Sequence, residues 1–262
     1  MYSMEHKKYL FEIKKRKYIT RFLQIIIIIS FIILWQILAD KDIINTFISS
    51  SPKKIINTII ELHKANNLYT HIWVTFYETM ISFSIGTFIG CLIATLLWWN
   101  PFVSKVLDPY LTVLNSLPKV SLGPIIIIWA GAGIKSIILM ALFISVIITI
   151  INVTQSFNDT DPNKIKLMNS FKATKSQIFF KLILPYNKNT IISAAKINIS
   201  MSMIGVIMGE FLVSKQGIGY LIMYGSQVFN LNLVMSGIVL LCIMSTFMYY
   251  GIVYLEKKLK RH

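Results

Sequence analysis

The sequence predicts an all-α, polytopic membrane protein with six transmembrane helices. Hydrophobic residues make up 55% of the 262-residue chain, above the ~45–50% that is usual for soluble domains. They gather into runs of about 20 residues, the length that a helix needs to cross a bilayer. The 26 lysines and arginines exceed the 11 acidic residues, which gives a formal net charge of +15. These basic residues are distributed unequally between the polar segments that separate the apolar runs.

The first apolar run lies between two polar segments. Residues 1–21 form a basic arm, and the isoleucine-rich run 22–38 is the expected first span. No small-residue cleavage site follows this run, so we expect an uncleaved helix and not a signal peptide. The polar segment 39–69 contains a short amphipathic helix, with Ser51 as its N-cap and Pro52 at its first position.

Residues 70–255 contain the other five spans, expected at about 72–99, 102–129, 134–153, 189–213 and 231–255. Small residues recur at every fourth position of the second span: Ser82, Gly86, Gly90 and Ala94. Such a stripe lets another helix backbone approach closely. The alternative is a thin helix face with no special partner.

The third span contains three prolines, Pro109, Pro118 and Pro124. They predict a kink or break, which a bilayer tolerates only where protein or a water-filled cavity covers the backbone. Broken helices are also where transporters place their pathways. The glycines that follow, at 131 and 133, predict a tight turn before the fourth span, because their spacing does not match a phosphate-binding loop.

The segment 160–186 is too polar to cross a bilayer. Its apolar residues recur at helical spacing: Ile165, Leu167, Met168, Phe171, Ile178, Phe179, Leu182 and Ile183. Pro185 is expected to end the helix, because proline lacks a backbone donor. From the pattern alone, the segment is equally well explained as a docking surface or as an amphipathic helix on lipid headgroups.

The sidedness of the positive charge predicts the orientation. Eighteen of the 26 lysines and arginines lie in the N-terminal arm, in the loop after the second span, in the segment up to residue 188 and in the basic tail 256–262, whereas six lie in the opposite loops. Because cytoplasmic loops carry the excess of lysine and arginine, we expect both termini and the segment 160–186 in the cytoplasm and residues 39–69 outside. Sidedness also accounts for the charge without a nucleic-acid partner.

Several chemistries are not expected. Cys91 and Cys242 both lie in apolar runs, and the histidines (His6, His63, His71 and His262) have no ligand spacing, so neither a disulfide framework nor a metal site is predicted. The sequence has no nucleotide-binding motif of the form G-x-x-x-x-G-K-[ST]. No nucleophile–base pair or paired carboxylates indicate an enzyme.

Ionisable residues in or near the spans are costly there and are therefore functional candidates. They are Glu78, Asp108, Lys119, Lys196 and Glu210. The alternative is that the acids lie near the membrane interfaces and pair with lysines. Lys119 is the most attractive pathway residue, because it lies on the broken third span. The other pathway candidates are Asn115, Ser116, Pro118, Ser121, Met201, Ser202, Met203 and Gly205, although the methionines are also typical packing residues.

Three stretches resemble a known family: residues 115–134, 171–185 and 209–222. They are similar, in the same order and at the same separations, to inner-membrane permease subunits of binding-protein-dependent ABC importers. The most similar branch is the nitrate, sulfonate and taurine branch, which includes carriers of thiamine precursors.

The chain departs from the family pattern in one loop. The loop of that family begins with a glutamate and two alanines and has a glycine at its bend, whereas this chain has Lys166, Leu167, Met168 and, at the bend, Lys172.

The resemblance implies a type I ABC importer permease fold, with residues 70–255 as the permease core, in a bacterial plasma membrane. It implies a second permease copy, a cytoplasmic ABC ATPase dimer that binds ATP and Mg²⁺, and an extracytoplasmic solute-binding protein. The solute would be a small anion or heterocycle, such as a sulfonate, nitrate, taurine or a thiamine precursor. The ATPase-coupling residues would be Phe171, Lys172, Ala173, Thr174, Ile178, Phe179, Leu182 and Pro185. This chain itself would hold no cofactor and would not be an enzyme.

The second hypothesis is a secondary carrier or channel that works alone. Such a protein needs buried carboxylates for ion coupling, and the scarcity of acids in the spans argues against it.

Overall fold

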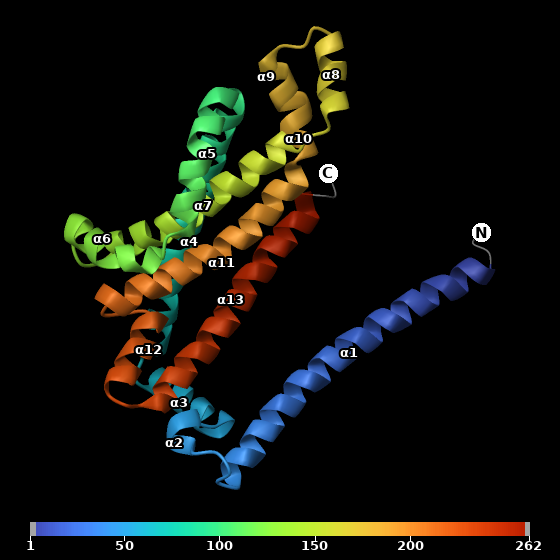
Figure 1. Cartoon of the computed structure of the whole chain (residues 1–262). Helices are drawn as coiled ribbons and strands as arrows, with labels where there is room; N and C mark the ends of the chain where they lie inside the picture. The colour runs from blue at the N-terminus through green and yellow to red at the C-terminus, as the bar shows by residue number, and fades with distance from the viewer. Residues whose placement is uncertain (1–3, 260–262) are drawn as a thin grey trace.

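The computed structural model describes residues 4–259, and the regular elements within that range are helices (Figure 1). In chain order they are α1 (Met4–Asp40), α2 (Thr46–Ser49), α3 (Pro52–Lys64), α4 (Leu68–Trp99), α5 (Pro101–Ser116), η1 (Lys119–Leu122), α6 (Gly123–Ala130), α7 (Ile134–Asn158), α8 (Pro162–Ser170), α9 (Lys175–Ile178), η2 (Phe179–Ile183), α10 (Leu184–Tyr186), α11 (Lys188–Val213), α12 (Ile218–Gln227) and α13 (Leu231–Leu259). Residues 260–262 of the predicted basic tail lie outside the described range.

Five helices of the described range are long and apolar enough to cross a membrane: α1, α4, α7, α11 and α13. The predicted third span is the pair α5 and η1–α6, which bends by 88° at its break. Pro118 is the N-cap of η1, and Pro124 lies in the first turn of α6. The all-α polytopic class and the break in the third span are therefore confirmed.

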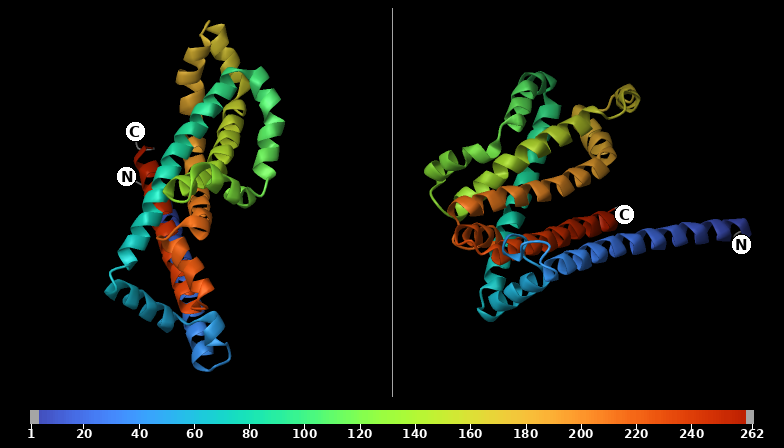
Figure 2. Two further views of the ribbon diagram at one scale, coloured as in Figure 1. Left: turned by 90° about the vertical axis from the view of Figure 1, so that its left-hand side faces the viewer. Right: turned by 60° about the horizontal axis from the view of Figure 1, so that its bottom comes forward.

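The centre of the molecule is formed by α4, α7 and α11, which pack most extensively on one another (Figures 1 and 2). The stripe of small residues on α4 is buried and faces α7. A β-carbon added at Gly86 would lie 2.6 Å from Oγ of Ser145, and one at Gly90 would lie 2.6 Å from Cβ of Thr149. The helices therefore approach as closely as backbone and short side chains allow.

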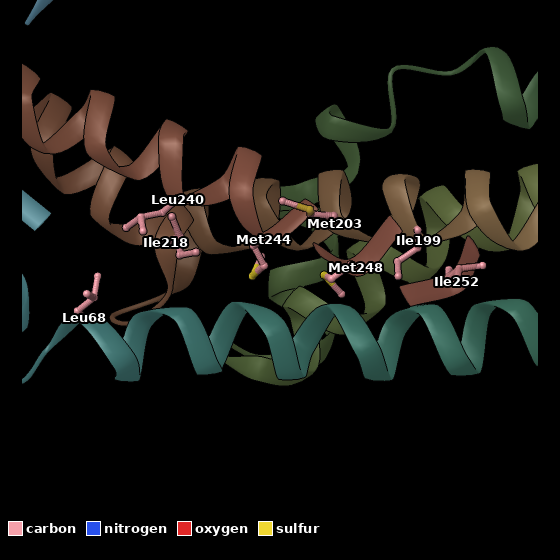
Figure 3. Packing of buried hydrophobic residues seen from close by; sticks show 8 residues of the cluster. All are labelled: Leu68, Ile199, Met203, Ile218, Leu240, Met244, Met248 and Ile252. Carbon is pink, nitrogen blue, oxygen red and sulfur yellow. The ribbon is translucent and has the colours of Figure 1, made fainter. Parts of the chain in front are cut away.

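A second buried cluster joins α4, α11, α12 and α13. Figure 3 shows its residues, which are Leu68, Ile199, Met203, Ile218, Leu240, Met244, Met248 and Ile252. Unbranched methionine side chains fill irregular gaps well, and three of them hold α13 against α11. Met203, a predicted pathway candidate, belongs to this packed cluster.

The N-terminal helix α1 extends away from the other helices and touches them mainly at its C-terminal end, near α3 (Figures 1 and 2). In the most apolar 18-residue stretch of α1, only 6% of the residues are buried against the rest of the chain. The predicted first span, 22–38, is the apolar part of this longer helix. Ser51 caps α3 and Pro52 begins it, as the sequence predicts.

Pro185 does not end its helix, contrary to the sequence-based expectation. The helical run from Lys175 continues to Tyr186, and the residues before the proline, Phe179–Ile183, form a π-helical turn. A π turn pairs residues five apart instead of four, so the chain can pass a proline that lacks the usual donor.

Gly205→Ala is expected to destabilise the protein. A β-carbon there would overlap the backbone of Ala141, which cannot rotate away, so α7 and α11 would have to separate. Overpacking of this kind costs ~1–3 kcal/mol and should lower the midpoint of thermal unfolding in detergent. Gly251→Ala is the matched control, because nothing lies within 4 Å of the added carbon. Equal midpoints for the two variants would contradict this account of the packing.

Candidate functional site

The segment 160–187, called here the basic hairpin, projects from one end of the bundle, at the top of Figure 1. It comprises α8, α9, η2 and α10. Its helices have their own caps. The side chain of Asp161 accepts a hydrogen bond from the N–H of Asn163 at 2.9 Å, and Thr174 and Gln177 form a reciprocal capping box at the start of α9. The hairpin is therefore defined by local hydrogen bonds as well as by packing.

Lys172 forms the bend between the two arms of the hairpin. Its φ is 55°, in the left-handed region. The N–H of Lys172 donates to the carbonyl of Asn169 at 2.8 Å, and the N–H of Ala173 donates to that of Met168 at 3.1 Å. These are the two bonds of a Schellman motif, which usually has glycine at this position.

An aromatic cluster fixes the base of the hairpin to α4 and α7. The ring centroid of Phe179 lies 5.1 Å from that of Trp98, 5.5 Å from that of Trp99 and 5.6 Å from that of Phe157. Nζ of Lys175 donates to the backbone carbonyl of Trp99 at 2.5 Å. Because α4 ends at Trp99, that carbonyl is one of the helix's unpaired acceptors, which a cation satisfies well.

Asn187 provides a second attachment, at the junction of the hairpin with α11. Its side-chain oxygen accepts a hydrogen bond from Oγ of Ser156 at 2.7 Å, and Nδ2 donates to Oγ1 of Thr160 at 2.7 Å and to the carbonyl of Ile183 at 2.9 Å. The side chains of Ser156, Thr160, Ile183 and Asn187 are all buried. Asn187 therefore joins the two ends of the hairpin to each other and to the C-terminal turn of α7.

The predicted coupling residues separate into two groups. Phe171 is 74% exposed at the tip, and Lys172, Thr174 and Pro185 are exposed as well, with Ala173 partly buried. Phe179 is only 3% exposed and Ile178 is also buried, while Leu182 packs against them. The predicted apolar stripe therefore points mainly into the protein, and its exposed members are Leu167 and Phe171.

The predicted pathway residues also separate into two groups. Asn115, Ser116, Pro118 and Ser121 are exposed around the break after α5. Lys119 lies beside them, and its Nζ donates to the backbone oxygen of Asn115 at 2.8 Å and to the side-chain oxygen of Asn115 at 3.1 Å. Its ammonium group therefore satisfies a carbonyl at the C-terminal end of α5.

On α11, by contrast, Ser202 and Gly205 are buried inside the bundle, and Met201 is partly buried. Gly205 contacts the backbone of α7 at Ala141. Within this chain these residues pack helices together and do not line an open passage.

Sequence reasoning missed a buried polar cluster at the other end of the bundle. The alternative that Glu78 and Glu210 pair with lysines is wrong. They are 2% and 1% exposed, their carboxyl groups are close neighbours, and neither forms a salt bridge within the described part of the chain. Lys196 pairs instead with Glu256 at 2.5 Å, and Asp108 is exposed.

The N-terminus of α12 lies against this carboxyl pair. The N–H of Gly219 donates to Oε2 of Glu210 at 2.5 Å, and Oγ1 of Thr75 donates to Oε1 of Glu210 at 2.6 Å. The N–H of Ile218 donates to Oγ1 of Thr75 at 2.7 Å, and that of Gly217 donates to Nδ1 of His71 at 3.0 Å. A signal was present in the glycines at 217 and 219, because a β-carbon at either position would collide with Glu210.

Lys172→Gly should stabilise the hairpin, whereas Lys166→Gly should destabilise it. Glycine adopts a positive φ without a steric cost, but within a helix it costs about 0.5–1 kcal/mol relative to alanine. Lys172 is in the left-handed bend, and Lys166 is on the exposed side of α8. Hydrogen exchange of the amides in α8 should therefore slow in the first variant and accelerate in the second. Acceleration in both would show that the bend does not need glycine-like freedom.

Comparison with known proteins identifies the family. Residues 86–261 match the family described as the binding-protein-dependent transport system inner membrane component. A Bacillus subtilis protein, SsuC, named as an aliphatic sulfonates transport permease, is 24% identical over 228 residues, which is 87% of this chain and 83% of that protein. The formylaminopyrimidine transport permease ThiX of Halalkalibacterium halodurans is 26% identical over 188 residues, 72% of this chain and 74% of its own.

The fold is shared with a chain of the MetNI methionine ABC transporter. The TM-score is 0.65 at 19% sequence identity, over 73% of this chain and 95% of that chain. Other relatives are named for taurine and nitrate transport, so the predicted branch is confirmed. The chain therefore belongs to the family of binding-protein-dependent transport system inner membrane components, as a multi-pass permease subunit of an ABC importer.

Proposed function

We propose that this chain forms half of the pathway of an ATP-driven importer, and that the basic hairpin receives force from a separate cytoplasmic ATPase dimer. The observation that supports this proposal is the difference between the buried base and the exposed tip of the hairpin. Its base is fixed by buried side chains of α4 and α7, and its tip exposes Phe171 and Lys172. A segment that is rigid at its base and open at its tip is suited to transmit force.

The attachments explain how that force reaches the spans. The aromatic cluster joins the hairpin to the C-terminal end of α4, Asn187 joins it to the end of α7, and the chain continues from the hairpin directly into α11. Displacement of the tip therefore moves the three central helices together. A second copy of the chain completes the pathway, and the ATPase supplies the sites for ATP and Mg²⁺.

The proposed solute is a small anion or heterocycle that an extracytoplasmic binding protein delivers. Support comes from the relatives, which are named for sulfonate, taurine, nitrate and formylaminopyrimidine transport. Lys119 is the proposed pathway cation, with the exposed polar side chains of Asn115, Ser116 and Ser121 beside it. Its ammonium group is held at the break between α5 and η1, where a broken helix can face water.

The proposed orientation places the N-terminal arm, the hairpin and the C-terminal end of α13 in the cytoplasm. The bias of lysine and arginine supports it. The geometry agrees, because the hairpin and the end of α13 lie toward one end of the bundle, and α2, α3 and the α12–α13 turn lie at the other (Figure 1).

Phe171→Asp is expected to weaken co-purification with the ATPase at least about tenfold, because an exposed aromatic contact of this size contributes roughly 1.5–3 kcal/mol when buried. The thermal midpoint of the permease should not change. Phe229→Asp is the matched control, since Phe229 is also 74% exposed but lies in the turn after α12, at the opposite end. Undiminished association of the Phe171 variant would count against the docking role. Phe179→Asp is unsuitable for this test, because it disrupts the buried base.

Single cysteines should report the orientation when Cys91 and Cys242 are replaced by serine. A membrane-impermeant thiol reagent should label Ser170→Cys, at the end of α8, only in inside-out vesicles. It should label Ser226→Cys, at the end of α12, only in right-side-out vesicles. Both positions are exposed. The reverse pattern would place the hairpin outside the cell and remove its access to any ATPase.

A further inference from the structure

The N-terminus of α12 is capped entirely by side chains from other helices. The first N–H groups of any helix have no partner within it, and their burial without one is costly. Here the N–H groups of Gly217, Ile218 and Gly219 donate to His71, Thr75 and Glu210, respectively. The helix α4, which is distant in sequence, and the helix α11, which directly precedes α12, thus complete the first turn of α12.

The surroundings of Glu210 are those of an ionised carboxylate. Its oxygens accept hydrogen bonds from the hydroxyl of Thr75 and from the backbone N–H of Gly219. The N–H can only donate and the hydroxyl can donate, whereas an ionised carboxylate can only accept. The N-terminal end of a helix also favours a negative charge. The hydrogen-bond donors and the helix N-terminus therefore favour the charged form of Glu210, whereas its burial disfavours it.

The surroundings of Glu78 are those of a protonated acid. Its carboxyl contacts that of Glu210, and its Oε2 has no hydrogen-bond partner within the described residues. Two ionised carboxylates cannot share one buried site, because like charges at contact distance repel strongly. A hydrogen bond between two carboxyl groups needs one proton. Glu78 is the acid whose Oε2 receives no donor, so the proton is assigned to Glu78.

Among the residues that the structure describes, neither acid is paired with a lysine or arginine. Two titratable side chains lie beside the first turn of α12, His71 of α4 and Tyr220 of α12, and their rings stack at 5.9 Å. Nδ1 of His71 accepts the N–H of Gly217, so the ring has a lone pair there and is neutral with its proton on Nε2. Gly217 and Gly219 let the α12 backbone approach Glu210 this closely.

We propose that Glu78 is a protonated acid that donates its O–H to the carboxylate of Glu210, and that this proton fastens α12 to α4 and α11. Both glutamates are positioning residues, because they act on α12 and not on a solute. Since the other end of α4 holds the basic hairpin, the same helix connects the hairpin to α12. The assignment concerns this chain alone and does not depend on the partners proposed above.

Conservative substitutions of the two glutamates should have unequal effects. In Glu78→Gln, the amide N–H₂ can still donate to the carboxylate, so the thermal midpoint of the full-length protein should stay within about 2 °C of the wild type. In Glu210→Gln, an N–H₂ group would face backbone donors, and the midpoint should fall by about 5 °C or more. Glu78→Ala, which lacks a donor, should lie between the two. An equal fall for both glutamine variants, or a larger one for Glu78→Gln, would overturn the proposal.

Infrared spectroscopy tests the proton directly, and it does so even if Glu210→Gln fails to fold. The wild type at neutral pH should show the C=O stretching band of a protonated carboxylic acid, and Glu78→Gln should lose that band. Glu256→Gln is the matched control, because Glu256 is also largely buried but pairs with Lys196, so the band should persist. A band that persists in Glu78→Gln would overturn the assignment. So would its absence from the wild type, as expected if a bound cation bridged two carboxylates.

Discussion

The close approach of α4, α7 and α11 is the constraint on which the rest of the structure depends. Lipid chains are as apolar as leucine, so helices in a bilayer associate through packing of small residues and not through a hydrophobic driving force. Here backbone meets backbone where Gly205 lies on Ala141 and Gly209 lies on Ile137, and Gly86 and Gly90 of α4 receive Ser145 and Thr149 of α7. Larger residues at these positions would separate the helices on which both functional ends are built.

The two ends of α4 hold different structures by different means. At its C-terminal end, Trp98 and Trp99 pack on Phe179, so that the hairpin is fixed mainly by burial of aromatic rings. At its N-terminal end, His71 and Thr75 hold α12 mainly through hydrogen bonds. Aromatic packing tolerates small changes in angle, whereas short hydrogen bonds do not. The orientation of α12 relative to α4 is therefore the more tightly specified of the two.

Much of the fold could be predicted from the sequence, because bilayer length, proline and charge sidedness leave strong local signals. The spans, the break after α5 and the cap of α3 at Ser51 all follow from residues adjacent in the chain. The direction in which the hairpin residues point could not be predicted so simply. The same helical spacing describes a stripe that faces a partner and one that faces its own chain, and Phe179 faces inward because Trp98, 81 residues earlier, lies beneath it.

The bend at Lys172 shows how tertiary structure replaces a missing sequence signal. A lysine in the left-handed region costs roughly 1–2 kcal/mol, so no local rule predicts it. Both Schellman bonds form, and the adjoining Met168 and Ala173 pack against the buried base of the hairpin. Packing and hydrogen bonding together therefore hold Lys172 in a left-handed conformation that is unfavourable for an isolated lysine.

The buried acids illustrate a different limit of sequence reasoning. Glu210 and the glycines at 217 and 219 fall within the segment that matches the family, residues 86–261, whereas Glu78 falls outside it. A comparison restricted to residues 86–261 contains Glu210 and α12, whose N-terminus Glu210 caps, but it does not contain Glu78. The alternative of lysine partners assumed that the acids lie near the membrane interfaces. A neutral carboxyl group costs far less to bury than a charged one, so a proton on Glu78 lets two acids occupy a membrane span with the α12 N-terminus as their only positive partner among the described residues.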